Sequence, residues 1–296
     1  MNSTSISLEF FPPRSEAQLR RFWCTLGCLQ TLKPSYISMT WGALGAASQA
    51  SLDILEPLLK DSEVPVTAHL SCSGETRSSM LDKIETLENM GVTRFLALRG
   101  DQTMPASNEA AQAGDRSGLQ HASDLVALLA ERGHKNISVA AYPDAHPESA
   151  DFASDIHWLK HKLDKGAKQA VTQFFFEAES FLRFRDKCEA AGISQKLIPG
   201  ILPIHDIEKV SQFSEKCGAV VPSKLLTQFQ KAVSPEDKHE AAVTHCLSLC
   251  QKLQAEGVDE FHLYTLNQSA LAYEIGSELL GSGAGRAGKA GESAAA

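Results

Sequence analysis

The chain has 296 residues, of which 43% are hydrophobic, so it can bury one large core in a single domain of the barrel or doubly wound kind. Its formal net charge of -8 and the lack of a basic patch argue against binding to nucleic acid or to an anionic membrane surface. No apolar run approaches the roughly 18 residues of a membrane span, and the first residues lack the charged and apolar regions of a signal peptide, so we expect a cytoplasmic protein.

Short apolar segments typical of strands alternate along the chain with longer segments whose apolar residues recur at helical spacing. The first strand is SLEFFPPR, residues 7–14, and two prolines stop it because proline donates no hydrogen bond to a sheet. Seven more strands are predicted at residues 36–41, 64–72, 94–101, 137–143, 170–176, 196–203 and 260–266. Helices are predicted at about residues 15–32, 47–60, 75–89, 151–165, 179–190, 206–216, 223–230 and 268–280, with two more beginning near residues 122 and 234. Residues 102–120 are predicted to form a poorly ordered insertion.

The joins between these elements favour a parallel sheet. A helix is repeatedly followed by glycine, an apolar residue and a strand, at Gly91, Gly166, Gly192 and Gly257. Glycine allows the left-handed turn that ends a helix, and a short link then leads into the next parallel strand. Eight strand and helix units predict an α/β fold, a single-domain (β/α)8 TIM barrel over residues 1–280, with a disordered Gly/Ala-rich tail at residues 281–296. An open doubly wound sheet is the alternative.

The seven cysteines predict neither a disulfide framework nor a zinc site, because they contain no C-x-x-C pair. Cys24 and Cys28, and likewise Cys246 and Cys250, are four residues apart on predicted helices, so each pair shares a helix face. We expect buried free thiols and no metal site.

One carboxylate, Glu9, lies within the apolar run of the first strand. Ionising a carboxyl group away from water is costly, so we expect burial to raise the pKa of Glu9 and to make it a proton donor near neutral pH. The alternative is a glutamate at a strand end that faces water.

Polar residues collect at the predicted carboxyl ends of the strands, where a β/α barrel builds its active site. They are Glu9, Thr40, His69, Arg99, Gly100, Asp101, Tyr142, His146, Gln173, Tyr264 and Asn267. Each has a structural explanation when taken alone, but their convergence on one end of a barrel favours a ligand site. Neutral donors, aromatic rings and few charges suit a flat organic molecule better than a metal-bound water. The helix after the fifth strand adds Asp155, Trp158 and Lys162 on one face, which are available to a second part of an extended ligand.

Several longer motifs make the chain recognisable. The segments SLEFFPPR, AHLSC, ALRGD, ISVAAYPDAHPE, TQFFFEAESFLRFRDKC, IPGILPI and FHLYTLN occur in order between about residues 7 and 280. The chain resembles the methylenetetrahydrofolate reductase family in its short bacterial form. The resemblance implies a flavoprotein that uses FAD and NAD(P)H to reduce 5,10-methylenetetrahydrofolate to 5-methyltetrahydrofolate, a step of one-carbon metabolism and methionine biosynthesis. We also expect a homo-oligomer.

The resemblance implies roles for individual residues. Glu9 matches the general acid that protonates N10 of the folate, so that the methylene bridge opens to an iminium cation that accepts hydride from reduced FAD. Asp101 matches an acid that contacts the pterin and tunes the flavin, and Gln173 matches a glutamine that folate and nicotinamide use in turn, in ping-pong kinetics. Phe229, close to Thr227, matches an aromatic residue that stacks on either substrate. The positions that fall in the FAD site are Thr40, His69, Arg99, Gly100, Asp101, Ala122, Tyr142, His146, Asp155, Trp158, His161 and Lys162.

Four positions depart from the family pattern. Trp158 and His161 stand where the family usually has asparagine and arginine, and His121 replaces an aromatic residue next to Ala122. Gln268 stands where the family often has an arginine for the folate tail. We hypothesise that folate chemistry is retained while FAD and nicotinamide handling are altered. The alternatives are a flavin-free reductase with direct hydride transfer, or a folate or flavin binding subunit that needs a partner protein.

Overall fold

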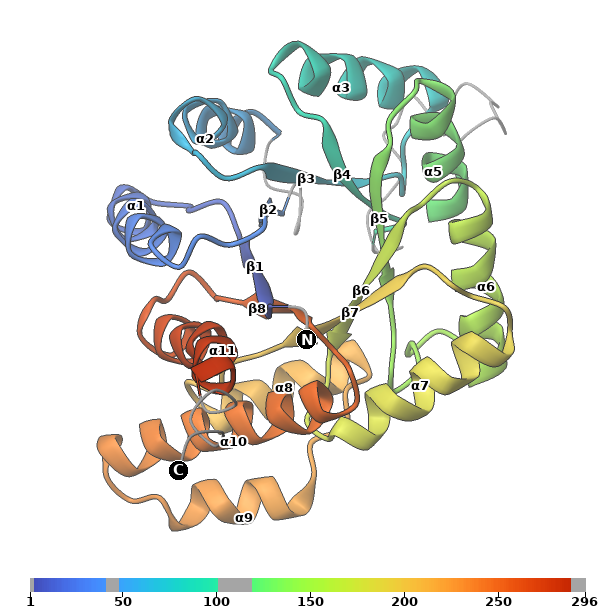
Figure 1. Ribbon diagram of the computed structural model, residues 1–296. Helices are drawn as coiled ribbons and strands as arrows, with labels where there is room; N and C mark the ends of the chain where they lie inside the picture. The colour runs from blue at the N-terminus through green and yellow to red at the C-terminus, as the bar shows by residue number, and fades with distance from the viewer. Residues whose placement is uncertain (1–2, 41–47, 101–118, 289–296) are drawn as a thin grey trace.

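The computed structural model describes residues 3–40, 48–100 and 119–288 of the chain. In these ranges eight parallel strands form a closed barrel in sequence order, and the last strand pairs with the first (Figure 1). The strands are β1 (Ser5–Phe10), β2 (Ile37–Met39), β3 (Val66–Ser71), β4 (Arg94–Leu98), β5 (Asn136–Ala141), β6 (Gln169–Phe174), β7 (Lys196–Ile201) and β8 (Glu260–Tyr264). The predicted (β/α)8 TIM barrel is therefore confirmed, and the open sheet is excluded.

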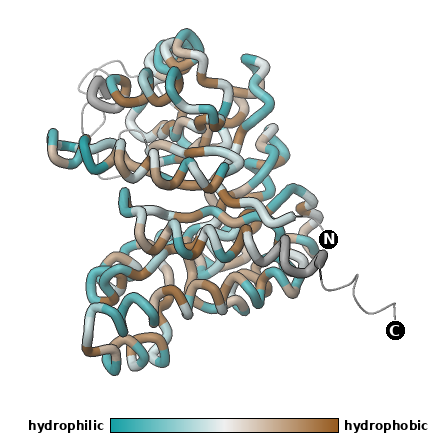
Figure 2. Tube along the Cα trace, turned by 60° about the vertical axis from the view of Figure 1, so that its left-hand side comes forward, coloured by the Kyte–Doolittle hydropathy of each residue, from teal (hydrophilic) through white to brown (hydrophobic). Residues whose placement is uncertain are grey.

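Helices surround the ring of strands on its outside (Figure 1). They are α1 (Glu16–Gln30), α2 (Ser48–Asp61), α3 (Arg77–Asn89), α5 (Ala122–Glu131), α6 (Phe152–Asp164), α7 (Ala178–Ala190), α8 (Ile207–Cys217), α9 (Ser223–Lys231), α10 (Pro235–Ala255) and α11 (Ala270–Gly288). Apolar and polar positions alternate along these helices (Figure 2), as expected for helices with one face on a sheet. None of the described helices is long and apolar enough to cross a membrane.

Successive side chains along each strand point alternately toward the surrounding helices and toward the interior of the barrel. In β1, Leu8 and Phe10 are fully buried in the core, and the ring of Phe10 lies 5.6 Å from that of Phe22 on α1. Ser7 and Glu9 alternate with them and meet side chains of β3 and β8 inside the barrel. The apolar core thus lies between sheet and helices, and the interior of the barrel is free to carry polar groups.

The start of α10 shows how local sequence fixes an element. Ser234 accepts a 3.0 Å hydrogen bond from the backbone N–H of Asp237, and the Asp237 carboxylate accepts one of 3.1 Å from the N–H of Ser234. Pro235 occupies the first turn, where its missing N–H has no partner to lose. This capping box begins the helix where the sequence predicts it.

Among the boundaries that differ from the prediction are those of the first strand and the last helix. β1 spans Ser5–Phe10, so the Phe11–Arg14 part of the predicted strand lies outside it. α11 continues to Gly288 instead of ending at Leu280, because a helix that has formed adds further residues at little cost, so the predicted tail is helical over residues 281–288. Residues 289–296, and residues 102–118 of the region predicted as an insertion, lie outside the described ranges.

All seven cysteines lie in the described ranges and are free thiols. Cys24 and Cys28 are exposed, so the prediction of buried thiols is wrong for this pair, because the face of α1 that they share points to solvent. Those that are buried, as predicted, are Cys72, Cys188, Cys246 and Cys250.

Candidate functional site

Glu9 points into the barrel from the carboxyl-terminal part of β1, and its side chain is 14% exposed. Its Oε2 atom lies 3.4 Å from Nε2 of His262 on β8 and 3.6 Å from Nε2 of His69 on β3. Both imidazoles are almost completely buried. The alternative of a glutamate that faces water is therefore excluded, and the carboxyl group lies between two titratable rings.

The two imidazoles change the expected acidity of Glu9. Burial raises the pKa of Glu9, but the charge of His69 and the hydrogen bond and charge of His262 outweigh burial, so the pKa lies below its ordinary value. The predicted rise is wrong for this reason. Burial lowers the pKa of His69 in turn, because an imidazolium is also costly away from water.

His262 was not singled out from the sequence, although it contacts the predicted acid. Its Nδ1 atom lies 2.7 Å from Oγ of Ser7, and its ring stacks on Tyr36 with a centroid distance of 5.9 Å. Parallel pairing of β1 with β8 sets Ser7 opposite His262 and Glu9 opposite Tyr264. The alternation in EFHLYTL was the available signal, because His262 and Tyr264 share the inward face.

Tyr264 and Asn267, both predicted at the mouth of the barrel, bind protein groups. The Tyr264 hydroxyl donates a 2.8 Å hydrogen bond to the carbonyl oxygen of Thr172 on β6. Asn267 receives a hydrogen bond from the Phe11 N–H at 3.1 Å and donates one to the Phe11 carbonyl at 2.8 Å. Thr265 donates to the Glu9 carbonyl at 2.6 Å. These contacts hold the carboxyl ends of β1, β6 and β8 in place around the Glu9 side chain.

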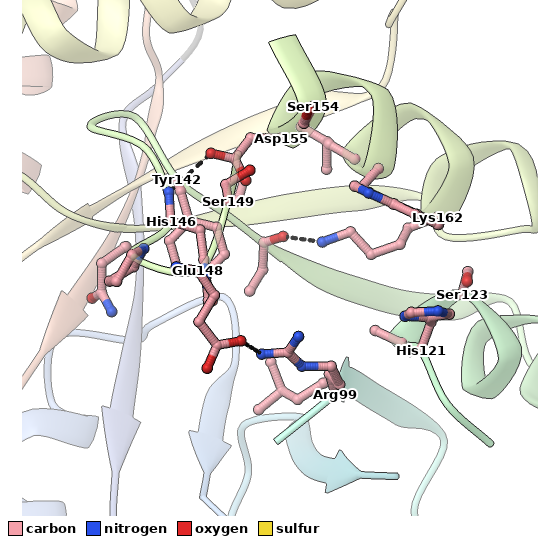
Figure 3. A pocket seen from close by; sticks show the side chains of 18 of the residues that line it. Arg99, His121, Ser123, Tyr142, His146, Glu148, Ser149, Ser154, Asp155 and Lys162 are labelled. Atoms are coloured by element: carbon pink, nitrogen blue, oxygen red, sulfur yellow. Dashed lines mark hydrogen bonds and ion pairs between the residues drawn. The ribbon is translucent and has the colours of Figure 1, made fainter. Parts of the chain in front are cut away.

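A cavity of about 570 Å³ lies at the carboxyl ends of β4, β5 and β6, between them and helices α5 and α6 (Figure 3). This volume lies within the range of small-molecule and cofactor sites. The predicted cofactor positions that line it are Arg99, Gly100, Ala122, Tyr142, His146, Asp155, Trp158 and Lys162, and His121 and Gln173 also belong to its wall. His161, Thr40 and His69 are not among the lining residues.

Lys162 and Asp155 come from the same face of α6, as the spacing predicts. Lys162 Nζ donates a 2.6 Å hydrogen bond to the Ala140 carbonyl, and burial lowers the pKa of this lysine to about 8, with nearby Asp155 acting in the opposite direction. The Asp155 carboxylate accepts a 2.9 Å hydrogen bond from the N–H of His146. Burial lowers the pKa of His146, and the Arg99 guanidinium adds to that effect. The wall of the cavity is thus cationic near Lys162.

Arg99 forms an ion pair with Glu148 at the cavity (Figure 3), which lowers the pKa of that carboxyl group. The next residue, Gly100, has a φ of +87°, and a Cβ atom there would meet Ser71 Oγ at 1.9 Å. Only glycine fits this turn, which leads from β4 to the cavity.

An aromatic group covers another part of the cavity. The ring of Trp158 is 45% exposed and stacks on that of His121, with a centroid distance of 5.1 Å and an interplanar angle of 28°. The ring centroid of His161 lies 5.8 Å from that of Trp158 in an edge-on arrangement, so His161 contacts the ring that lines the cavity. Flat rings of this kind suit a planar base.

The cavity therefore fits a dinucleotide such as FAD. An anionic diphosphate would suit the partly buried Lys162, Arg99 and the first backbone N–H groups of α5. The rings of Trp158 and His121 suit a planar group. Thr40 Oγ1 and His69 Nε2 are buried and make no hydrogen bond to any described residue, so both are available to a ligand at the mouth of the barrel.

The predicted substrate residues are dispersed. Gln173 lines the cavity, and its Oε1 atom accepts a 3.0 Å hydrogen bond from the N–H of Phe174. Gln268 is exposed in the turn after β8. Thr227 is exposed on α9 and donates its hydroxyl to the Ser223 carbonyl at 2.9 Å. Asp101 lies outside the described residues, so its predicted role remains untested.

Phe229 is buried in the apolar core, 4% exposed, so its ring is not accessible to a substrate in this structure. The amphipathic α9 turns this ring inward, away from solvent. On the preceding helix, α8, Phe213 is 48% exposed and stacks on Phe174 with a centroid distance of 5.6 Å. Phe174 contacts Tyr264 in turn, so Phe213 is an accessible aromatic ring beside the mouth of the barrel.

Among the described residues, no group of three or more His, Cys, Asp or Glu side chains is arranged to hold a metal ion. The chemistry available in these ranges is therefore that of an acid between imidazoles and a polar, partly cationic cavity.

Residues 1–280 match the sequence profile of the family described as methylenetetrahydrofolate reductase. Similar curated proteins include 5,10-methylenetetrahydrofolate reductase of Pectobacterium carotovorum subsp. carotovorum, 36% identical over 272 residues, which span 92% of this chain and 88% of that protein. The enzyme of the same description from Escherichia coli (strain K12) is 35% identical over 272 residues, 92% of this chain and 89% of that protein.

A solved structure described as an uncharacterized protein from Clostridium thermocellum that binds two copies of 5-methyl-5,6,7,8-tetrahydrofolic acid has a TM-score of 0.62 to this chain. The match covers 94% of each chain at 14% sequence identity. At that identity the likeness shows the fold.

Proposed function

The chain belongs to the methylenetetrahydrofolate reductase family, and from this premise we propose that it reduces 5,10-methylenetetrahydrofolate to 5-methyltetrahydrofolate with NAD(P)H as electron donor. The observation that carries the proposal is Glu9, held inside the barrel between two imidazoles at the end where a cavity with the chemistry of a dinucleotide site also lies. Because all eight strands are parallel, their carboxyl ends meet at this one end.

In this proposal Glu9 is the general acid. It donates a proton to N10 of the folate, which breaks the bond between N10 and the bridging carbon and leaves that carbon as an electrophile. The closed barrel leaves only 14% of the Glu9 side chain exposed, and Thr265 and Asn267 hold the end of β1 that carries it. Gln173, at the cavity wall, would orient the reacting molecules.

FAD would bind in the cavity, with Lys162 and Arg99 near its diphosphate and Trp158 against a ring. When bound, it would supply hydride transfer between NAD(P)H and the folate. Arg99 would have to exchange Glu148 for the anionic ligand. We propose Phe213, in place of Phe229, as the ring that stacks on substrate, because it is accessible beside the mouth.

A flavin-free reductase is the second candidate. Two contacts inside the cavity favour it. Arg99 is paired with Glu148 and the ring of His121 is stacked on that of Trp158, so groups that would bind a dinucleotide already have partners within the protein. In that case hydride would pass directly from the nicotinamide to the folate.

The absorbance spectrum of the purified protein distinguishes the two. A flavin spectrum that NAD(P)H bleaches and methylenetetrahydrofolate restores, with 5-methyltetrahydrofolate as product, supports the first proposal. Formation of that product by protein that contains no flavin and does not bind added FAD supports the second. Protein that forms no 5-methyltetrahydrofolate with either nicotinamide, with or without FAD, contradicts both. A homo-oligomer, a cytoplasmic location and a role in methionine biosynthesis are further parts of the proposal.

A further inference from the structure

We propose that His157 and His161 form a binding site for one divalent transition-metal ion of the Ni²⁺, Cu²⁺ and Zn²⁺ class, on the exposed face of α6 beside Trp158. The site goes beyond the proposed function, because neither folate reduction nor flavin binding requires it. It follows from the spacing of the two imidazoles along α6 and from their contacts with the same indole ring.

The two histidines are four residues apart within one continuous helix. Both positions lie inside α6, and side chains four apart in a helix are neighbours, with about 5–6 Å between their Cβ atoms. Two histidines at this spacing on one helix face bind zinc in the H-E-x-x-H arrangement of metalloproteases. The intervening residues here are Trp158, Leu159 and Lys160, with no glutamate to act as a base. The pattern therefore indicates metal binding without hydrolytic chemistry.

Both imidazoles meet the ring of Trp158 edge-on. The ring centroid of His157 lies 5.7 Å from that of Trp158 at an interplanar angle of 74°, and that of His161 lies 5.8 Å away at 81°. Two rings that contact one indole occupy the same stretch of surface. Rotation about their side-chain bonds then brings one nitrogen of each to metal-binding distance, which is about 2.0–2.1 Å for zinc.

The helix presents these imidazoles to solvent, where a hydrated ion can reach them. Ile156, Leu159 and Leu163 are buried against the barrel and hold the opposite face of α6 in place. His157 is exposed, and His161 is partly exposed. Binding of an ion therefore requires no opening of the core.

Neighbouring charged groups determine which ligands the ion would have. Lys160 forms an ion pair with Asp164 at 3.0 Å, which balances the lysine charge that would repel a cation and occupies the carboxylate. Among the described residues, no three His, Cys, Asp or Glu side chains surround a common point. The site therefore has two protein ligands, with water in the other coordination positions. Imidazole nitrogens suit Ni²⁺, Cu²⁺ and Zn²⁺, whereas Mg²⁺ and Ca²⁺ prefer oxygen.

Ni²⁺ is the probe, because it binds imidazole and, unlike Cu²⁺, does not oxidise thiols. The parent protein is the full chain with Cys24→Ser and Cys28→Ser, which removes the exposed thiols from competition. Titration calorimetry should show one Ni²⁺ per chain. In His157→Gln the affinity should fall about tenfold or more, because two linked imidazoles chelate the ion and one does not. His239→Gln, which changes an exposed histidine paired with Glu274, should bind as the parent does.

A second control keeps the number of histidines on α6 but breaks their spacing. In the double variant Ala153→His, His157→Gln, the new imidazole is eight residues from His161, about 12 Å along the helix axis. It should bind Ni²⁺ as weakly as His157→Gln alone. An affinity within twofold of the parent in either variant overturns the proposal.

Trp158 provides a second measurement. Ni²⁺ held beside the indole should quench its fluorescence, and this part of the quenching should be absent in Trp158→Phe. It should saturate at the same Ni²⁺ concentration as the calorimetric binding. Binding of one ion that leaves the Trp158 emission unchanged places the metal elsewhere and overturns the proposal. A protein that binds Ni²⁺ as expected but reduces no folate supports this inference and contradicts the proposed function.

Discussion

The Tyr264 hydroxyl reaches past β7 to donate a 2.8 Å hydrogen bond to the Thr172 carbonyl on β6. The path is open because the β7 residue beneath it is Gly200, where a Cβ atom would meet the Thr172 oxygen at 2.2 Å and Tyr264 Cε2 at 2.6 Å. A side chain at residue 200 therefore has to displace the tyrosine or the strand, inside the part of the barrel that supports Glu9.

Gly200→Ala should lower the free energy of unfolding by about 3 kcal/mol, because the new methyl group overpacks a buried site. Gly27→Ala is the matched control, since Gly27 lies in α1 with no atom within 4 Å of its added Cβ. That variant should be stabilised by about 0.5–1 kcal/mol, because alanine favours the helix. Urea unfolding of both variants measures the contrast, and equal stabilities would contradict the account of Gly200.

Acid should destabilise the protein partly through Glu88. This carboxylate on α3 binds Arg132 and, at 2.8 Å, His134, and the hydrogen bond from Arg132 leads the effects that lower its pKa from 4.5 to about 2. The stabilisation is complete above pH 4.5 and is lost as pH falls from there to about 2. Glu88→Gln should therefore show a smaller loss of stability over this range, measured by urea unfolding at several pH values. Glu56→Gln, at an exposed position on α2, should follow the wild-type curve.

Two phenylalanines on successive helices should respond in opposite ways. Phe229→Ala removes a buried core ring and should cost about 3–5 kcal/mol of stability, with KM for the folate little changed if the protein folds. Phe213→Ala removes a half-exposed ring beside the mouth, so it should raise the KM for the folate and change stability by less than about 1 kcal/mol. Steady-state kinetics with urea unfolding separate the two effects. A raised KM for Phe229→Ala alone would restore the role predicted from the sequence.

The sequence predicted the barrel because its signals are local. Periods of two and of 3.6 residues mark strands and helices, and glycine after several of the helices marks the return to a parallel strand, as at Gly91 with its φ of +90°. The same logic identified part of the cavity wall, since strand ends such as Arg99 and Gly100 and one face of α6 are read directly from spacing.

What the sequence did not reveal depends on contacts between distant segments. His262 and Glu9 are 253 positions apart, so no local pattern shows that the ring faces the carboxylate. For the same reason the predicted direction of the pKa shift of Glu9 was wrong. The shift depends on the imidazole rings of His69 on β3 and His262 on β8, which are distant in sequence. Phe229 was assigned from the resemblance to the family, and only packing shows that its ring is buried while that of Phe213 is exposed.

Trp158 should report on occupation of the cavity. Its ring lines the cavity and is 45% exposed, so a bound flavin or adenine ring that stacks on it should quench its fluorescence. In Trp158→Phe this part of the quenching should disappear, with affinity for FAD reduced by up to about tenfold, the equivalent of one aromatic contact. Trp23→Phe, a change on α1 away from the cavity, should quench as wild type does. Equal quenching in Trp158→Phe and wild type would contradict stacking at this ring.

The affinity of the cavity for an anionic nucleotide should depend on Lys162. Because the pKa of this lysine is lowered to about 8, it carries its charge below that pH and loses it above, and a bound diphosphate favours the charged form. Binding of ADP, measured by titration calorimetry, should therefore weaken as the pH rises from about 7 to about 9.5. Lys162→Met should bind ADP about tenfold more weakly at neutral pH and lose this dependence, because one charged hydrogen bond is removed. Lys165→Met, at the exposed end of α6, serves as the control and should match wild type. Unchanged ADP affinity in Lys162→Met would exclude the lysine from the anion site.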